Sequence, residues 1–168
     1  AYSTRVGNGP FPTEFRRETD GELEDTIREL GREYGVTTGR PRRCGYLDLV
    51  ALRYACRVNS IDGLVLTHID VYDSMDEIKV CVAYEIDGEI TDNFPASIQA
   101  LNRSRPVTRS FPGWKKQLGN TAFYDDLPRQ AKDYIEFIEN FTETPIDIVS
   151  VGYERKQTIV RRTPWTLS

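Results

Sequence analysis

Residues 36–43 combine the side chains and the backbone freedom that a site for anionic oxygens needs. They read Val-Thr-Thr-Gly-Arg-Pro-Arg-Arg, in a chain of 168 residues whose formal net charge is −4. Arginine guanidinium groups donate paired hydrogen bonds to carboxylates and phosphates. Gly39 lets the backbone approach a ligand closely, while Pro41 fixes one φ angle and favours an extended Arg40. The pattern predicts a loop that holds a small molecule rich in anionic oxygens, although composition alone also fits a solvated basic loop.

A second candidate site is Thr67-His68-Ile69-Asp70, which follows a short apolar run at 63–67. Such a run predicts a buried strand, and open α/β sheets place ligand groups just beyond the ends of their strands. The two carboxylate oxygens of Asp70 can accept the N1–H and the exocyclic amine of guanine, an edge that adenine does not present. The alternative is an aspartate that only caps a turn.

The third candidate, Ser150-Val151-Gly152, ends a predicted strand at 146–151. A glycine at the end of a strand permits the close approach of a flat ring. Backbone groups of the chain can then form hydrogen bonds with the edge of that ring. Taken alone, this pattern is weak, because many strands end in Ser-x-Gly.

The elements that must position these residues are predicted from periodicity, caps and turn residues. Residues 91–127 are rich in turn residues, Asp20 is a candidate N-cap, and Gly35 is placed to end the helix before the arginine loop. The mixture predicts an α/β fold. We expect strands at 2–6, 63–67, 78–85, 146–151 and 158–161, and helices at 21–34, 46–59 and 128–141.

The apolar positions of the three helices are predicted to belong to the core rather than to a ligand site. Helical spacing selects Leu23, Ile27, Leu30 and Tyr34 in the first helix, Leu47, Val50, Ala51, Tyr54, Ala55 and Val58 in the second, and Ala131, Ile135, Ile138 and Phe141 in the third.

Several classes of protein are disfavoured by composition. Cys44, Cys56 and Cys81 are odd in number and lack metal-ligand spacing, so we expect reduced thiols in a cytoplasmic protein. His68 is the only histidine, which argues against a Ser-His-Asp triad or a zinc centre. No apolar run approaches the ~20 residues that cross a bilayer, and the acidic balance argues against nucleic acid as the main partner.

The sequence contains no Gly-x-x-x-x-Gly-Lys-[Ser/Thr] loop that could cradle phosphates. Gly7-Asn8-Gly9 is a poor substitute, because it is a lone Gly-x-Gly followed by Pro10. The chain also begins at Ala1 without a methionine, inside a predicted strand, and Met75 is its only methionine. A natural start at Ala1 is therefore not expected unless a segment upstream has been removed.

Blocks of sequence along essentially the whole chain resemble the adenylosuccinate synthetase family, and they occur in the family's order. The resemblance implies the C-terminal part of a P-loop-NTPase-like fold, with a mixed sheet and flanking helices. It also implies one segment, 1–168, of a single domain whose N-terminal phosphate-loop part is absent. The blocks are residues 1–14, 35–48, 76–84, 111–114, 126–128 and 145–152.

The resemblance implies a cytoplasmic, homodimeric purine-biosynthesis ligase that joins inosine monophosphate (IMP) to L-aspartate and hydrolyses GTP with Mg²⁺. Arg40 would bridge aspartate and the IMP ribose, Val6 would line that ribose pocket, and Arg42 would lie toward GTP. Arg43 remains a structural candidate. The loop implied to close over aspartate comprises Val36, Thr37, Thr38, Gly39, Arg40, Pro41 and Arg42, and the implied GTP contacts are Arg42, His68, Ile69, Asp70, Ser150, Val151 and Gly152.

By the same resemblance, the catalytic residues and the magnesium ligands belong to the N-terminal part, so the segment alone is expected to be inactive. His68 departs from the family's Thr-Lys-x-Asp pattern, because it stands where lysine is usual. It would supply less positive charge at neutral pH. Two alternatives therefore stay open: a paralogous ligase acting on another purine nucleotide such as dGMP, and a non-catalytic module that binds guanine nucleotides.

Overall fold

The computed structural model describes residues 8–163, and its mixture of helices and strands confirms the α/β class. Val6 and the strand predicted at 2–6 lie outside the described residues. The helices are α1 (Arg17–Gly31), α2 (Leu49–Asn59), α3 (Ile98–Arg103) and α4 (Arg129–Thr142), with 3-10 turns η1 (Ile69–Tyr72) and η2 (Tyr124–Asp126). The strands are β1 (Leu47–Asp48), β2 (Leu64–Leu66), β3 (Glu77–Ile86), β4 (Glu89–Thr91), β5 (Arg105–Pro112), β6 (Ile146–Ser150) and β7 (Thr158–Val160).

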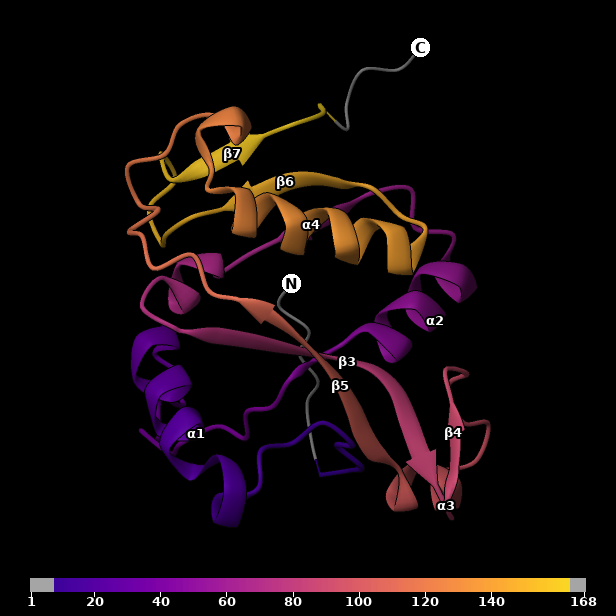
Figure 1. Ribbon diagram of the computed structural model, residues 1–168. Coiled ribbons are helices and arrows are strands. Elements are labelled where there is room, and N and C mark those ends of the chain that lie inside the picture. Colours follow the sequence, from indigo (N-terminus) through magenta and orange to yellow (C-terminus); the bar gives the residue numbers. More distant parts are fainter. Residues whose placement is uncertain (1–7, 164–168) are drawn as a thin grey trace.

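The strands form two mixed sheets. In the first, β3 pairs in parallel with β1 and antiparallel with β4 and β5. In the second, β6 lies between β2, which is parallel to it, and β7, which is antiparallel. Figure 1 shows α4 between these sheets, beside β6 on one side and above β3 and β5 on the other.

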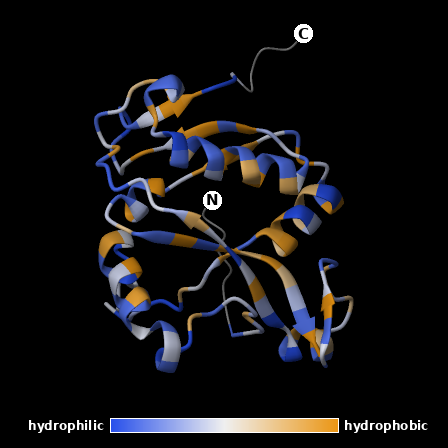
Figure 2. Ribbon diagram, viewed as in Figure 1, coloured by the Kyte–Doolittle hydropathy of each residue, from blue (hydrophilic) through white to orange (hydrophobic). Residues whose placement is uncertain are grey.

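One apolar core joins both sheets through α4. Tyr134, Ile135 and Ile138 of this helix are fully buried, and they share a cluster with Ile78 of β3 and Val149 of β6. Hydrophobic residues colour most of β6 in Figure 2, as expected for a central strand that is covered by a helix. The prediction of α4 is confirmed, with Pro128 as its N-cap.

The first helix differs from its prediction at both ends. It begins at Arg17 and ends at Gly31, where Arg32 adopts a left-handed conformation, so Gly35 does not terminate it. Asp20 is not the N-cap, because it lies inside the first turn and accepts the backbone N–H of Arg16 at 3.0 Å. No residue of α1 is buried, and the predicted core position Leu30 is exposed.

The second helix begins later than predicted, because residues 47–48 form β1 before Asp48 caps α2 by accepting the Ala51 N–H at 3.0 Å. Leu47 and Val50 are buried as predicted. Tyr54 and Val58 are exposed, so their assignment to the core is wrong.

The strand β5 was not predicted. It pairs with β3 along almost its whole length, although the region 91–127 is rich in turn residues. The strand tolerates Pro106 and Pro112 because only one of its edges pairs with a described strand. A tight turn joins β3 to β4, with φ values of 53° at Asp87 and 89° at Gly88.

Candidate functional site

The arginine loop leaves α1 and folds back on itself. Its ends are closed by a bridge between Tyr34 and Pro41 and by a 2.8 Å hydrogen bond from the Gly35 N–H to the Arg40 carbonyl. Gly39 turns the chain with a φ of 63° and donates its N–H to the Gly35 carbonyl at 2.7 Å. The tip is open to solvent, since Val36 is 97% exposed. The segment is therefore a closed-ended loop with a free tip.

The three arginines of the loop differ in the hydrogen bonds and ion pairs that their guanidinium groups make. No ion pair or side-chain hydrogen bond joins the exposed Arg40 guanidinium to another described residue. Arg42 donates from Nη1 to the Glu33 carboxylate at 3.0 Å, and the carboxylate of Glu33 is largely buried. Arg40 is therefore the arginine whose guanidinium is open to an incoming carboxylate.

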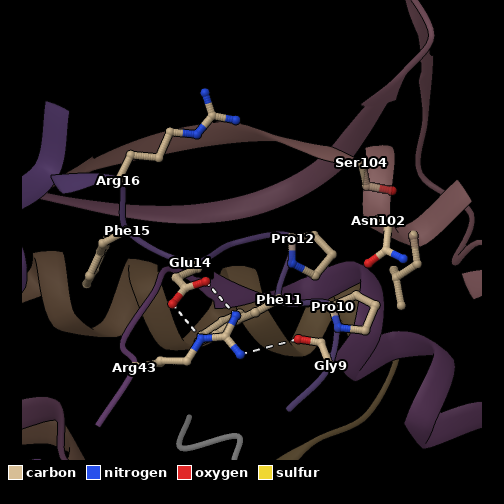
Figure 3. A pocket seen from close by; sticks show the side chains of 11 residues that line it. Gly9, Pro10, Phe11, Pro12, Glu14, Phe15, Arg16, Arg43, Asn102 and Ser104 are labelled. Atoms are coloured by element: carbon tan, nitrogen blue, oxygen red, sulfur yellow. Dashed lines mark hydrogen bonds and ion pairs between the residues drawn. The ribbon is translucent and has the colours of Figure 1, made fainter. Parts of the chain in front are cut away.

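Arg43 is tied to the segment that precedes α1. Its Nε and Nη2 each donate to the Glu14 carboxylate at 2.5 Å, and Nη1 reaches the Gly9 carbonyl at 3.3 Å. Figure 3 shows this pair beside Phe11, at the wall of a hollow of about 340 Å³. Gly45 lets the two segments approach, because a Cβ there would lie 2.3 Å from the Thr13 carbonyl oxygen. These contacts fit a structural role for Arg43.

The two segments predicted to contact guanine, residues 67–70 and 150–152, leave the second sheet at the same end of its strands. Strands β2 and β6 are parallel, and Leu66 lies opposite Val149 in their register. Residues 67–70 and 150–152 therefore follow neighbouring strand ends. This is the position that ligand sites favour in open α/β sheets.

Asp70 lies in the turn η1, which starts after His68 at a φ of 58°. Its Oδ1 atom is buried and has no hydrogen-bond partner among the described residues. His68 is exposed, whereas the Ile69 side chain is fully buried, so only the backbone of Ile69 can meet a ligand. The unpaired carboxylate oxygen can accept a hydrogen bond from a donor outside this part of the chain.

Residues 150–157 form a loop that Gln157 holds together. The Gln157 side chain donates to the Gly119 carbonyl at 3.0 Å and accepts the Glu154 N–H at 3.0 Å. A Cβ at Gly152 would lie 2.2 Å from Gln157 Oε1, so a side chain at this position would displace the Gln157 amide. The Val151 side chain is fully buried, and Ser150 Oγ donates to the Gly152 carbonyl at 2.6 Å. Residues 150–152 therefore offer mainly backbone groups to a ligand.

A cation–π contact links the base of the arginine loop to this second loop. The Arg32 guanidinium carbon lies 4.9 Å from the centre of the Tyr153 ring. Sequence reasoning missed both residues and also Gln157, because only the folded chain brings residues 32 and 153 together. The contact places the base of the arginine loop near the loop that follows β6.

Within residues 8–163, no three histidine, cysteine or acidic side chains converge in a way that could hold a metal ion. Over the same residues, no helix is both long enough and apolar enough to span a membrane.

Comparison with known proteins gives one consistent result. The adenylosuccinate synthetase family model matches residues 1–159. The chain is 54% identical over 159 residues to an adenylosuccinate synthetase of Aquifex aeolicus and 51% identical over 164 residues to one of Salinibacter ruber. These matches cover 95% and 98% of the chain, and the chain spans 36% of the length of each relative.

A solved structure agrees with the sequence relatives. It is titled a fully ligated adenylosuccinate synthetase from Plasmodium falciparum, and it matches with a TM-score of 0.84 and 40% identity. The match covers 94% of this chain and 37% of that one. The fold is therefore the one that the sequence resemblance implied, and the chain belongs to the adenylosuccinate synthetase family.

Proposed function

We propose that this chain is the C-terminal portion of a GTP-dependent ligase that joins IMP and L-aspartate to form adenylosuccinate, with GDP and phosphate as the other products. The observation that carries the proposal is the meeting of residues 67–70 with 150–152 at one sheet edge, near the base of a loop that carries an open arginine. The family match along 1–159 supports the same reading.

In this proposal the loop 36–42 binds aspartate. The Arg40 guanidinium pairs with the aspartate carboxylate and reaches the IMP ribose, whose pocket Val6 completes. Thr37 and Thr38 contribute hydroxyl groups, and Arg42, which is paired with Glu33, lies toward GTP. Arginines in a closed site stabilise the negative charge that develops on transferring phosphoryl oxygens.

The guanine base is proposed to lie against the second sheet. The Asp70 carboxylate would accept the two N–H groups of the guanine edge, because its Oδ1 is buried and unpaired among the described residues. His68 would stack on the base, while Ile69, Ser150, Val151 and Gly152 would contribute backbone contacts.

The remaining parts of the reaction are proposed to belong to the rest of the full-length protein. By the family resemblance, these are the phosphate loop, the catalytic residues and the Mg²⁺ ligands. The active form would be a cytoplasmic homodimer. The 168-residue chain by itself would then be inactive.

An assay of adenylosuccinate formation tests the proposal. The full-length protein should convert IMP and aspartate when GTP and Mg²⁺ are present, and the 168-residue chain should not. Activity of the isolated chain would contradict the division of labour proposed above.

The same assay with dGMP in place of IMP addresses the paralogue that His68 leaves open. If the protein turns over dGMP and not IMP, its proposed reaction would be the paralogous one and not adenylosuccinate synthesis.

A further inference from the structure

Asp73 lies one turn after Asp70 and is held at both of its carboxylate oxygens. Its Oδ1 accepts the indole N–H of Trp114 at 2.9 Å, and its Oδ2 accepts the backbone N–H of Leu118 at 2.9 Å. The Asp73 backbone N–H donates to the Asp70 carbonyl at 3.1 Å. With only 6% of its surface exposed, Asp73 fixes the η1 turn to the segment 114–118.

Trp114 makes this anchor stiff. It is itself buried, and its ring packs edge-on against Tyr72 with 6.1 Å between the ring centres. Leu118 is fully buried in the same core. Both donors to Asp73 therefore come from groups that cannot move without disturbing the core.

Asp70 and Asp73 differ in the hydrogen bonding of their carboxylate groups. Both oxygens of Asp73 are paired, whereas Asp70 Oδ1 is buried without a partner among the described residues. Side chains three residues apart in a 3-10 turn lie on the same side of it. The Trp114 indole N–H and the Leu118 backbone N–H are therefore used by Asp73 and are not available to Asp70.

We propose that Asp73 is a positioning residue for base recognition. By accepting the Trp114 indole N–H and the Leu118 backbone N–H, Asp73 fixes the η1 turn and keeps the Asp70 carboxylate free for a ligand with two adjacent N–H groups. The edge of guanine has such a pair, so this inference rests on the guanine site proposed above.

The Asp73→Asn variant separates this role from simple packing. Asparagine keeps the size of the side chain but replaces one acceptor oxygen with an NH₂ group, which would face an N–H donor. One donor of segment 114–118 is then released toward Asp70, and the turn loses one of its two anchors. The expected consequence is a weaker and less selective guanine contact.

The experiment compares GTP with inosine triphosphate (ITP), which lacks the 2-amino group, as the co-substrate of the full-length protein. For the unmodified protein, we expect kcat/KM to favour GTP by about 10- to 100-fold, because ITP leaves one Asp70 contact unmade. In Asp73→Asn we expect this ratio to fall by about 10-fold, mainly through a higher KM for GTP and with little change in kcat. Trp114→Phe removes one donor to Asp73 and should shift the ratio in the same direction.

Asp48→Asn is the matched control. Asp48 also accepts one backbone N–H, from Ala51 at 3.0 Å, and one side-chain donor, Tyr84 Oη at 2.5 Å, but it does so at the start of α2. It should lower the melting temperature and keep the GTP-to-ITP ratio of the unmodified protein.

Two results would overturn the inference, and they differ. If the unmodified protein prefers GTP and Asp73→Asn keeps that preference, Asp73 only supports packing, and the guanine site stands. If the unmodified protein does not discriminate between GTP and ITP, the guanine site itself is wrong and the role of Asp73 falls with it. If Asp73→Asn does not fold, the ratio measured for Trp114→Phe decides.

Discussion

Each arginine of the loop is distinguished by what already holds it. Arg43 is bound to Glu14 through two hydrogen bonds, and Arg42 to Glu33 through one. Arg40 has no such partner among the described residues. A guanidinium that is already paired has fewer donors and less uncompensated charge to offer a ligand, so Arg40 is the arginine best placed to make the first contact in the proposed aspartate site.

Replacing Arg40 with alanine in the full-length protein should reduce activity without loss of stability. We expect kcat/KM for aspartate to fall by about 100-fold, the effect of losing charge-assisted hydrogen bonds to a carboxylate. The melting temperature should hardly move, since the side chain is exposed. Steady-state kinetics with varied aspartate, together with thermal unfolding, measure both quantities.

Arg43→Ala is the control for this comparison. It removes the Glu14 pair, so it should affect the segment before α1 rather than the KM for aspartate. A larger rise in that KM for Arg43→Ala than for Arg40→Ala would contradict the roles assigned to the two arginines.

The three cysteines should be inert in the folded chain, because all three are buried and free. Burial raises the pKa of Cys81 to about 12 and also raises the pKa of Cys44. A raised pKa keeps a thiol protonated at pH 8, and the thiolate is the reactive form. Ellman's reagent at pH 8 should therefore react slowly with the native chain and rapidly with three thiols after unfolding in guanidinium chloride.

An exposed thiol provides the reference rate for this measurement. Val36→Cys places a cysteine at the most exposed apolar position of the loop and should react within the mixing time. Native cysteines that react as fast as this reference would show that the core opens far more readily than its packing suggests.

At the scale of elements, the periodicity of apolar residues in the sequence best predicted the helices and strands whose apolar face is buried. The helix α4 and the strand β6 were predicted nearly to the residue, since both lie in the core. The strand β5 was missed because its prolines and polar residues reflect an edge position that only the pairing with β3 reveals. The start of α1 was misplaced because Arg16, its N-cap, makes no side-chain capping bond.

The candidate site shows the same division. The loop 36–42 and Asp70 could be found from residue type and from family resemblance. The contacts that position them could not, because Asp73 with Trp114, and Arg32 with Tyr153, are distant in the sequence. A polar pair of this kind leaves no periodic pattern.

Because α4 links the two sheets, shortening one of its buried side chains should cause a large loss of stability. Ile135 is fully buried within the core that joins β3, β5 and β6. Ile135→Ala should lower the free energy of unfolding by about 2–5 kcal/mol, through lost apolar burial and the cavity left behind. Val36→Ala, at a 97% exposed position, should change it by less than about 0.5 kcal/mol.

Urea denaturation of the 168-residue chain measures both variants. If Ile135→Ala lowered the free energy of unfolding by no more than Val36→Ala does, α4 would not be the element that holds the two sheets together.

At the scale of the whole molecule, the candidate site depends on chain segments that are far apart in sequence. Residues 67–70 meet 150–152 only because β2 pairs with β6, and α4 connects this sheet to the one built on β3. The chain spans 36% of the length of the relatives from Aquifex aeolicus and Salinibacter ruber. Of the guanine nucleotide, the contacts proposed for this chain reach mainly the base. The size of the ligand contact therefore predicts how tightly the chain alone can bind.

The 168-residue chain should bind GDP only weakly. The base contacts proposed for Asp70 and for the backbone at 150–152 would amount to a few hydrogen bonds of about 1 kcal/mol each, and no phosphate-cradling motif is present in the sequence. A total near −4 kcal/mol corresponds to a Kd of about 1 mM, which NMR titration can measure with ADP as the control. Binding of GDP at micromolar concentration would favour the non-catalytic module, because the segment would then form a complete nucleotide site by itself. A millimolar Kd, with ADP weaker still, would favour a base pocket whose phosphate contacts come from the rest of the ligase.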